Sequence, residues 1–193
     1  MKKRILSIVL CLVMVFSLLP FTASAASAIP INEETFPDPV FREYVLKIVG
    51  SSVLTEEKAQ QIEVLDVSDD NIKEVLGDRA PITSLMGIRY LRYVKDLNCS
   101  GQELKKTLNL EQNSRVEKLN CSGNQLTGLW FHKGSLLRYL DCSVNQFTAL
   151  NLSKNPELTE LSCSSNKLTS LDLSANTKLQ EINASSNKLT ALD

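Results

Sequence analysis

The residue types best able to do chemistry in this chain are five cysteines and a single histidine, His132. Four of the cysteines recur every 21 or 22 residues, at positions 99, 121, 142 and 163. Equivalent residues of stacked parallel strands lie about 4.8 Å apart. That distance exceeds the usual ~3.5–4.5 Å between the Cβ atoms of a disulfide. We therefore predict that Cys99, Cys121, Cys142 and Cys163 are free thiols that pack as small buried apolar side chains.

A metal site is also disfavoured by the spacing. The sequence has no Cys-x-x-Cys pair, and His132 lies in the other half of the repeat. Ala184 continues the cysteine column, so the position requires a small residue rather than sulfur. We expect neither a metal ion nor another cofactor.

Catalysis has little support in the sequence. A Ser-His-Asp triad would have to use His132, which lies in a predicted turn beside Gly134. The serines are repeat positions, and the carboxylates Asp141, Glu160 and Glu181 would share one flat face without a cleft to shift their pKa values. We therefore expect a protein that is not an enzyme.

The cysteines belong to a repeat that determines the fold. A fixed period of 21 or 22 residues is typical of a stacked solenoid. Each repeat has two similar halves, as in LTELSCSSN followed by KLTSLDLSAN at residues 158–176. Apolar residues two apart indicate strands, so we predict two short strands per turn. Stacked turns would form two parallel sheets around a narrow core, in a right-handed coil.

Asparagines follow the strands at fixed distances. They stand where the chain must bend, because Asn tolerates left-handed backbone angles and its amide bonds nearby backbone groups. Gly134 would permit the same bend. We assign both columns a structural role. The first column is Gln102, Asn124, Asn145, Asn166 and Asn187, and the second is Asn113, Gly134, Asn155 and Asn176.

Residues 1–25 are predicted to be a secretory signal peptide. A basic start at residues 2–4 precedes an apolar run at residues 5–19, which is too short to span a bilayer, and small-residue cleavage patterns follow. A lasting membrane anchor is the alternative. Without these residues, 18 of the 21 basic residues and all 22 acidic residues remain, a net charge of −4. That balance argues against a nucleic-acid partner.

Three further segments complete the predicted organisation. Residues 26–62 form a helical N-terminal cap over the open end of the solenoid, with one helix from Asp38-Pro39 to Gly50 and another after Thr55. Residues 63–93 are divergent first repeats, with Asp70 in the asparagine column and a loop insertion near residues 74–81. Residues 94–193 are the cysteine-ladder repeats. They stop halfway through a turn, so we expect a truncated piece of a longer protein, with pairing of this end to a partner as the alternative.

The repeat L-x-x-L-x-C-S-x-N-x-L-T-x-L-D-L-S-x-N resembles the leucine-rich repeats of internalin-type secreted bacterial proteins. It is most similar to the internalin J-like subclass, which has 21-residue repeats and a cysteine ladder. The resemblance implies a curved leucine-rich repeat solenoid of α/β type, built mostly from short parallel strands, whose concave sheet meets a protein partner. Relatives often carry a calcium loop after the first helix, but residues 49–54 contain no carboxylate. We therefore do not expect calcium binding.

Two surfaces are candidate contact sites. Tyr139 is the only aromatic residue of its outward row on the predicted concave face, and Tyr and Arg are frequent interface anchors. Trp130 is predicted to point outward on the opposite face. The predicted concave contacts are Lys118, Arg138, Tyr139, Glu160 and Glu181.

We therefore expect a secreted, non-catalytic protein-binding module with a role in adhesion or cell-surface interaction. The alternatives are a structural or carbohydrate-associating cell-envelope component with a glycan ligand, and a remnant of a longer surface protein.

Overall fold

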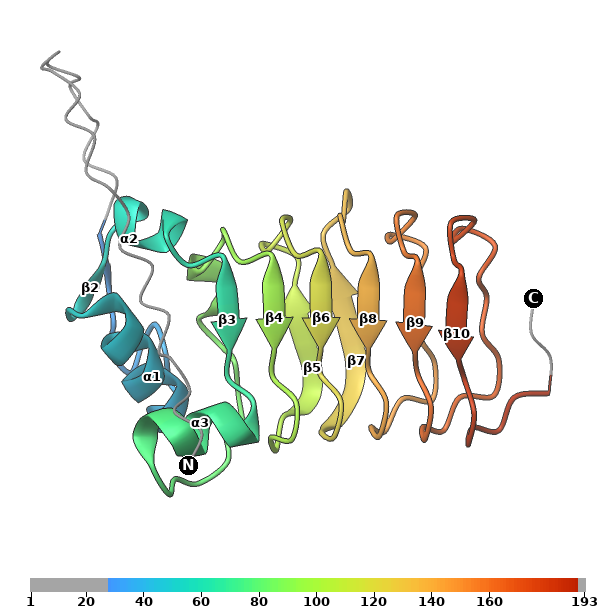
Figure 1. Ribbon diagram of the computed structural model, residues 1–193, viewed down its shortest axis with the longest axis horizontal. Coiled ribbons are helices and arrows are strands. Elements are labelled where there is room, and N and C mark those ends of the chain that lie inside the picture. Colours follow the sequence, from blue (N-terminus) through green and yellow to red (C-terminus); the bar gives the residue numbers. More distant parts are fainter. Residues whose placement is uncertain (1–27, 191–193) are drawn as a thin grey trace, which may run out of the picture.

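A parallel sheet of six short strands runs along the molecule in the computed structural model, which describes residues 28–190 (Figure 1). Each turn contributes one three-residue strand, and neighbouring strands pair without a shift, as Leu97 with Leu119 and Leu119 with Leu140. The fold is a leucine-rich repeat solenoid of parallel strands, as predicted. In chain order the strands are β3 (Val64–Asp66), β4 (Asp96–Asn98), β6 (Lys118–Asn120), β8 (Tyr139–Asp141), β9 (Glu160–Ser162) and β10 (Glu181–Asn183).

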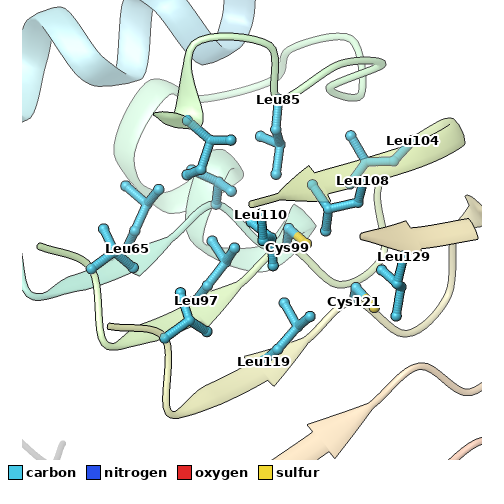
Figure 2. Packing of buried hydrophobic residues seen from close by; sticks show 14 of the residues in the cluster. Leu65, Leu85, Leu97, Cys99, Leu104, Leu108, Leu110, Leu119, Cys121 and Leu129 are labelled. Atoms are coloured by element: carbon cyan, nitrogen blue, oxygen red, sulfur yellow. The ribbon is translucent and has the colours of Figure 1, made fainter. Parts of the chain in front are cut away.

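The inward side chains of this sheet form the core. The central residue of each strand from β3 to β9 is at most 3% exposed, whereas Ile182 in β10 is 45% exposed. Figure 2 shows Leu65, Leu97 and Leu119 from successive turns beside Cys99 and Cys121. All four described cysteines are free and fully buried, which confirms the prediction. Burial raises the pKa of Cys99 to about 12 and that of Cys163 to about 11, so both thiols stay protonated at neutral pH.

The first asparagine column links consecutive turns. Asn145 donates through Nδ2 to the carbonyls of Cys121 and Cys142 and accepts through Oδ1 from the Leu126 amide at 2.9 Å. Asn124 and Asn166 repeat this pattern. The left-handed bend, however, lies one residue earlier than predicted. Positive φ angles occur at the residue before each column member: Gly101, Gly123, Val144, Ser165 and Ser186.

The second half of each turn differs from the prediction. Within residues 28–190, only two turns form strands there, β5 (Lys105–Leu110) and β7 (Gln125–Phe131), which pair in parallel. In later turns Asn151 and Asp172 accept the amides of Ser153 and Ser174, as Asn109 of β5 accepts the amide of Glu111, but no strand forms there. Leu150, Leu152 and Leu171 are still buried and Leu173 is partly buried, so the core continues without the second sheet.

The second asparagine column is also less regular than predicted. Gly134 does not have a positive φ angle, and the hydroxyl of Ser135 accepts a hydrogen bond from the side-chain Nδ2 of Asn155 at 2.9 Å. The Oδ1 atoms of Asn113, Asn155 and Asn176 are buried without a hydrogen-bond partner. This column therefore binds the turns together more weakly than the first.

Two helices and a short pair of antiparallel strands cover the N-terminal end of the core (Figure 1). Helix α1 (Pro39–Val49) begins after the N-cap Asp38 and ends at Gly50 in left-handed conformation, as predicted. Helix α2 (Glu56–Gln60) is capped by Thr55. Strand β1 (Ile29–Pro30) pairs antiparallel with β2 (Val53–Leu54). The predicted signal peptide lies outside the described residues, and the proposed division of the chain into segments stays a prediction.

The insertion after β3 begins with a helix rather than a plain loop. Helix α3 (Asp69–Leu76) is capped by Ser68 and has two acidic residues in its first turn, which complement the helix dipole. Asp70 is an exposed residue of this turn and does not extend the asparagine column. The chain then returns through Gly87, where a Cβ would lie 2.5 Å from Phe36, to the short 3-10 helix η1 (Ile88–Tyr90).

Candidate binding surfaces

The outward face of the six-stranded sheet carries a row of side chains in register. Lys118 pairs with Tyr139, Tyr139 with Glu160, and Glu160 with Glu181. Four of the five predicted contact residues therefore lie side by side across β6, β8, β9 and β10. Strand spacing places neighbouring backbones about 4.8 Å apart, so a partner could contact all four at once.

Tyr139 is the half-buried member of this row, between exposed Lys118 and Glu160. Burial and then the negative charges of Asp141 and Glu160 raise the pKa of its phenol. The ring therefore keeps its hydroxyl proton at neutral pH and can donate a hydrogen bond. An amphipathic ring between opposite charges has the chemistry of an interface anchor.

The next row toward the C-terminal ends of the strands is more ordered than a plain solvated surface. Asn120 Oδ1 accepts from both the backbone amide and the hydroxyl of Ser122, and Asp141 accepts the same pair from Ser143. These local bonds fix the polar side chains beside Tyr139. The same pattern recurs at Asp66, Asn98 and Asn183.

Arg138 does not lie in the row with Tyr139. It precedes β8, and its amide donates to the Glu117 carbonyl while its own carbonyl accepts from Thr159. The pKa of the Glu157 carboxyl is lowered mainly by Lys178, whose Nζ lies 2.6 Å from it. The positive charge of Arg138 lowers this pKa further but more weakly. The arginine therefore belongs to the border of the sheet, where strand alternation separates it from Tyr139.

Trp130 lies on β7 and is 56% exposed, whereas its neighbours Leu129 and Phe131 are buried. This orientation is the predicted one. Trp130 is in register with Asn109 on β5, so it stands on the outer surface of the small second sheet. His132, which follows it, accepts the Gly134 amide at 3.0 Å and closes the predicted turn.

A groove of about 420 Å³ lies beside β5 and was not predicted from the sequence. Residues 83–89 form one wall, and β5 with its flanking residues forms the other. We call this the β5 groove. Leu108 and Leu126 lie at its buried side, while Met86 on the rim is 63% exposed.

This architecture is similar to that of proteins whose structures have been solved. The functional domain of InlJ from Listeria monocytogenes, which includes a cysteine ladder, is similar with a TM-score of 0.73 and 32% identity. The match covers 89% of this chain and 36% of that chain. The four described cysteines of this chain also form a buried column, one in each turn from β4 to β9. The chain is an internalin-like leucine-rich repeat protein.

Two other internalins from Listeria monocytogenes are also similar to this internalin-like chain. Internalin inlF matches with a TM-score of 0.45 and 18% identity, over 87% of this chain and 62% of that one. Internalin C2 matches with a TM-score of 0.34 and 18% identity, over 86% and 91%. No protein-family model and no curated protein sequence matches the chain.

Within residues 28–190, no group of three or more His, Cys, Asp and Glu side chains in the internalin-like solenoid could hold a metal ion. Nor does this described part contain a helix with the length and apolar character needed to cross a bilayer. The candidate binding surfaces are the Tyr139 row of the six-stranded sheet, the exposed Trp130 on β7 and the β5 groove.

Proposed function

We propose that this internalin-like chain is a secreted bacterial protein without catalytic activity that binds a protein partner through the outward face of its six-stranded sheet. The binding would serve adhesion or another interaction at the cell surface. The observation that supports the proposal most is the registered row of Lys118, Tyr139, Glu160 and Glu181.

The shape and chemistry of this face suit a protein partner better than a small substrate. Its side chains stand on a broad sheet, and the half-buried Tyr139 has a charged neighbour on each side. Protein interfaces concentrate their binding energy in such aromatic anchors and surround them with polar residues. Lys118 on one side and Glu160 with Glu181 on the other would orient the partner by charge.

The experiment is a binding screen of residues 26–193 against an array of extracellular proteins and, in parallel, an array of glycans. We expect a protein hit whose affinity falls at least about tenfold in Tyr139→Ala, the scale of an interface anchor. The matched control is Trp130→Ala, which removes an exposed aromatic from the other sheet and leaves this affinity unchanged.

Two outcomes contradict the proposal. A protein hit that tolerates Tyr139→Ala but is lost in Trp130→Ala would move the binding site to the opposite face. Hits confined to the glycan array would instead favour a carbohydrate-associating component of the cell envelope.

A further inference from the structure

We propose that the β5 groove binds an extended peptide segment of another protein, which pairs with the free edge of β5 as an added strand. This inference goes beyond the proposed function, since it concerns a different surface and a different mode of recognition.

The groove lies where one stacking contact of the solenoid is missing. The amides of Glu103 and Gln125 donate to the carbonyls of Ile82 and Leu104, respectively, so these turns are stacked in order. Residues 83–88 therefore face β5 across the groove, on the side where the preceding turn would supply a paired strand in a regular solenoid. They form no strand, and among the described residues the second sheet contains only β5 and β7.

Residues 83–88 form no strand beside β5 because a carboxylate of the N-terminal cap accepts two of their backbone amides. Asp38 Oδ2 accepts the backbone amides of Thr83 at 2.8 Å and Ser84 at 3.2 Å. The hydroxyl of Ser84 in turn accepts the amide of Met86 at 3.1 Å. Three backbone amides of this wall therefore donate to side-chain oxygens and not to β5. In the described part of the chain, no backbone hydrogen bond joins residues 83–90 to Lys105–Leu110.

An edge strand presents a row of backbone donors and acceptors that match another extended backbone. The β5 groove provides this edge together with space, because about 420 Å³ falls within the usual ~300–1,000 Å³ of ligand sites. In strand addition, main-chain bonds supply the affinity and pockets for alternate side chains supply the specificity. The chemistry of the free edge therefore favours a polypeptide over a sugar.

The walls indicate the side chains of such a peptide. Buried Leu85, Leu108 and Leu126 offer an apolar floor, and Figure 2 shows Leu85 across from Leu108. Thr107 and Asn109 are exposed on the outer side of β5. Since side chains of a strand alternate between faces, the peptide should have apolar residues at every second position and polar residues between them.

The test selects peptides from a phage-displayed library of random eight-residue sequences on residues 26–193. We expect selected peptides with alternating apolar residues that bind the chain and the Tyr139→Ala variant equally. Met86→Asp, which places a charge on the rim of the groove, should lower the affinity of these peptides at least about tenfold. The matched control is Leu136→Asp, the same kind of change at an exposed residue outside the groove, and it should leave binding unchanged.

Backbone methylation then tests strand pairing directly. Each selected peptide is synthesised in two forms, with N-methyl groups on the odd or on the even amides. Only alternate amides of an added strand point at β5, so one form should lose at least about tenfold in affinity and the other should bind nearly normally.

Three results would overturn the inference: no selected peptide, peptides that bind Met86→Asp as well as the parent chain, or two methylated forms of equal affinity. Failure of the Tyr139 proposal would leave these readouts unaffected, so the two proposals are tested separately.

Discussion

The carboxylate of Asp38 accepts two hydrogen bonds from Thr83, one from its amide at 2.8 Å and one from its hydroxyl at 3.0 Å. The same side chain caps α1 through Oδ1, which accepts the amides of Val40 and Phe41. One buried carboxylate therefore starts the cap helix and fixes the wall of the β5 groove.

Replacement of Asp38 by alanine should lower the free energy of unfolding by about 3 kcal/mol, because it removes a helix cap and leaves the amides of Thr83 and Ser84 without their acceptor. Urea unfolding followed by circular dichroism measures the change. Thr55→Ala is the control, since it removes only the single 3.3 Å cap bond of α2 and should cost about 1 kcal/mol. Equal losses in the two variants would contradict the bridging role of Asp38.

Val144 has a φ of 53°, which is a strained value for a β-branched residue. Val144→Gly should therefore stabilise the chain by about 0.5–1 kcal/mol, since the relieved strain of about 1–2 kcal/mol exceeds the entropy that glycine adds to the unfolded state. The reverse change at the equivalent position, Gly123→Ala, should destabilise it by a similar amount. Thermal unfolding of both variants checks this, and a destabilised Val144→Gly would refute it.

The two asparagine columns should differ in their contribution to stability. Asn145→Ala leaves the Leu126 amide without an acceptor in the core and removes a donor from each of the carbonyls of Cys121 and Cys142, so we expect a loss of about 3 kcal/mol. Asn155→Ala removes a bond to the Ser135 hydroxyl and an oxygen that has no partner, so the loss should be about 1 kcal/mol. The comparison uses urea unfolding at pH 7, and a larger loss in Asn155→Ala would reverse the ranking.

The buried thiols should make the protein less stable in alkali. Folding raises the pKa of Cys99 from 9.0 to about 12, so between these values the unfolded chain releases a proton that the native chain retains. The free energy of unfolding therefore falls as pH rises, by up to about 1.4 kcal/mol per pH unit for each thiol. Cys99→Ala should make this slope shallower between pH 9 and 11, measured by urea unfolding. An unchanged slope would contradict the raised pKa.

The repeat made the first half of each turn predictable. A fixed period gives equivalent residues the same environment, so Leu97, Cys99 and Asn124 each specify a column and not a single position. Asp38-Pro39 and Gly50 likewise mark the ends of α1 through local chemistry. Helix α3 also had a local signal, Ser68 followed by two aspartates, which the expected asparagine column concealed.

Features that depend on distant residues were not predicted. The β5 groove exists because Asp38 binds an amide 45 residues away, and no periodicity in the sequence indicates that contact. The second-half strands stop after β7 although Asn109 of β5 makes the same local bond as Asn151 and Asp172 of the later turns, so the sequence patterns of the strand and turn versions are similar. Tyr139 and Lys118 could be placed in one row by strand alternation, whereas Arg138 was grouped with them only by its nearness in sequence.

Native-state alkylation with peptide mass spectrometry tests the stacked solenoid most directly, because the four described cysteines report on every turn from β4 to β9. We expect Cys99, Cys121, Cys142 and Cys163 to stay unmodified by iodoacetamide in the folded chain at pH 8, and all four to react in denaturant without a reducing agent. Labelling of these thiols in the folded chain would show that they do not form a buried column in the core of the solenoid. Cysteines that stay unmodified in denaturant would show disulfides, which the stacking of equivalent strand positions does not allow.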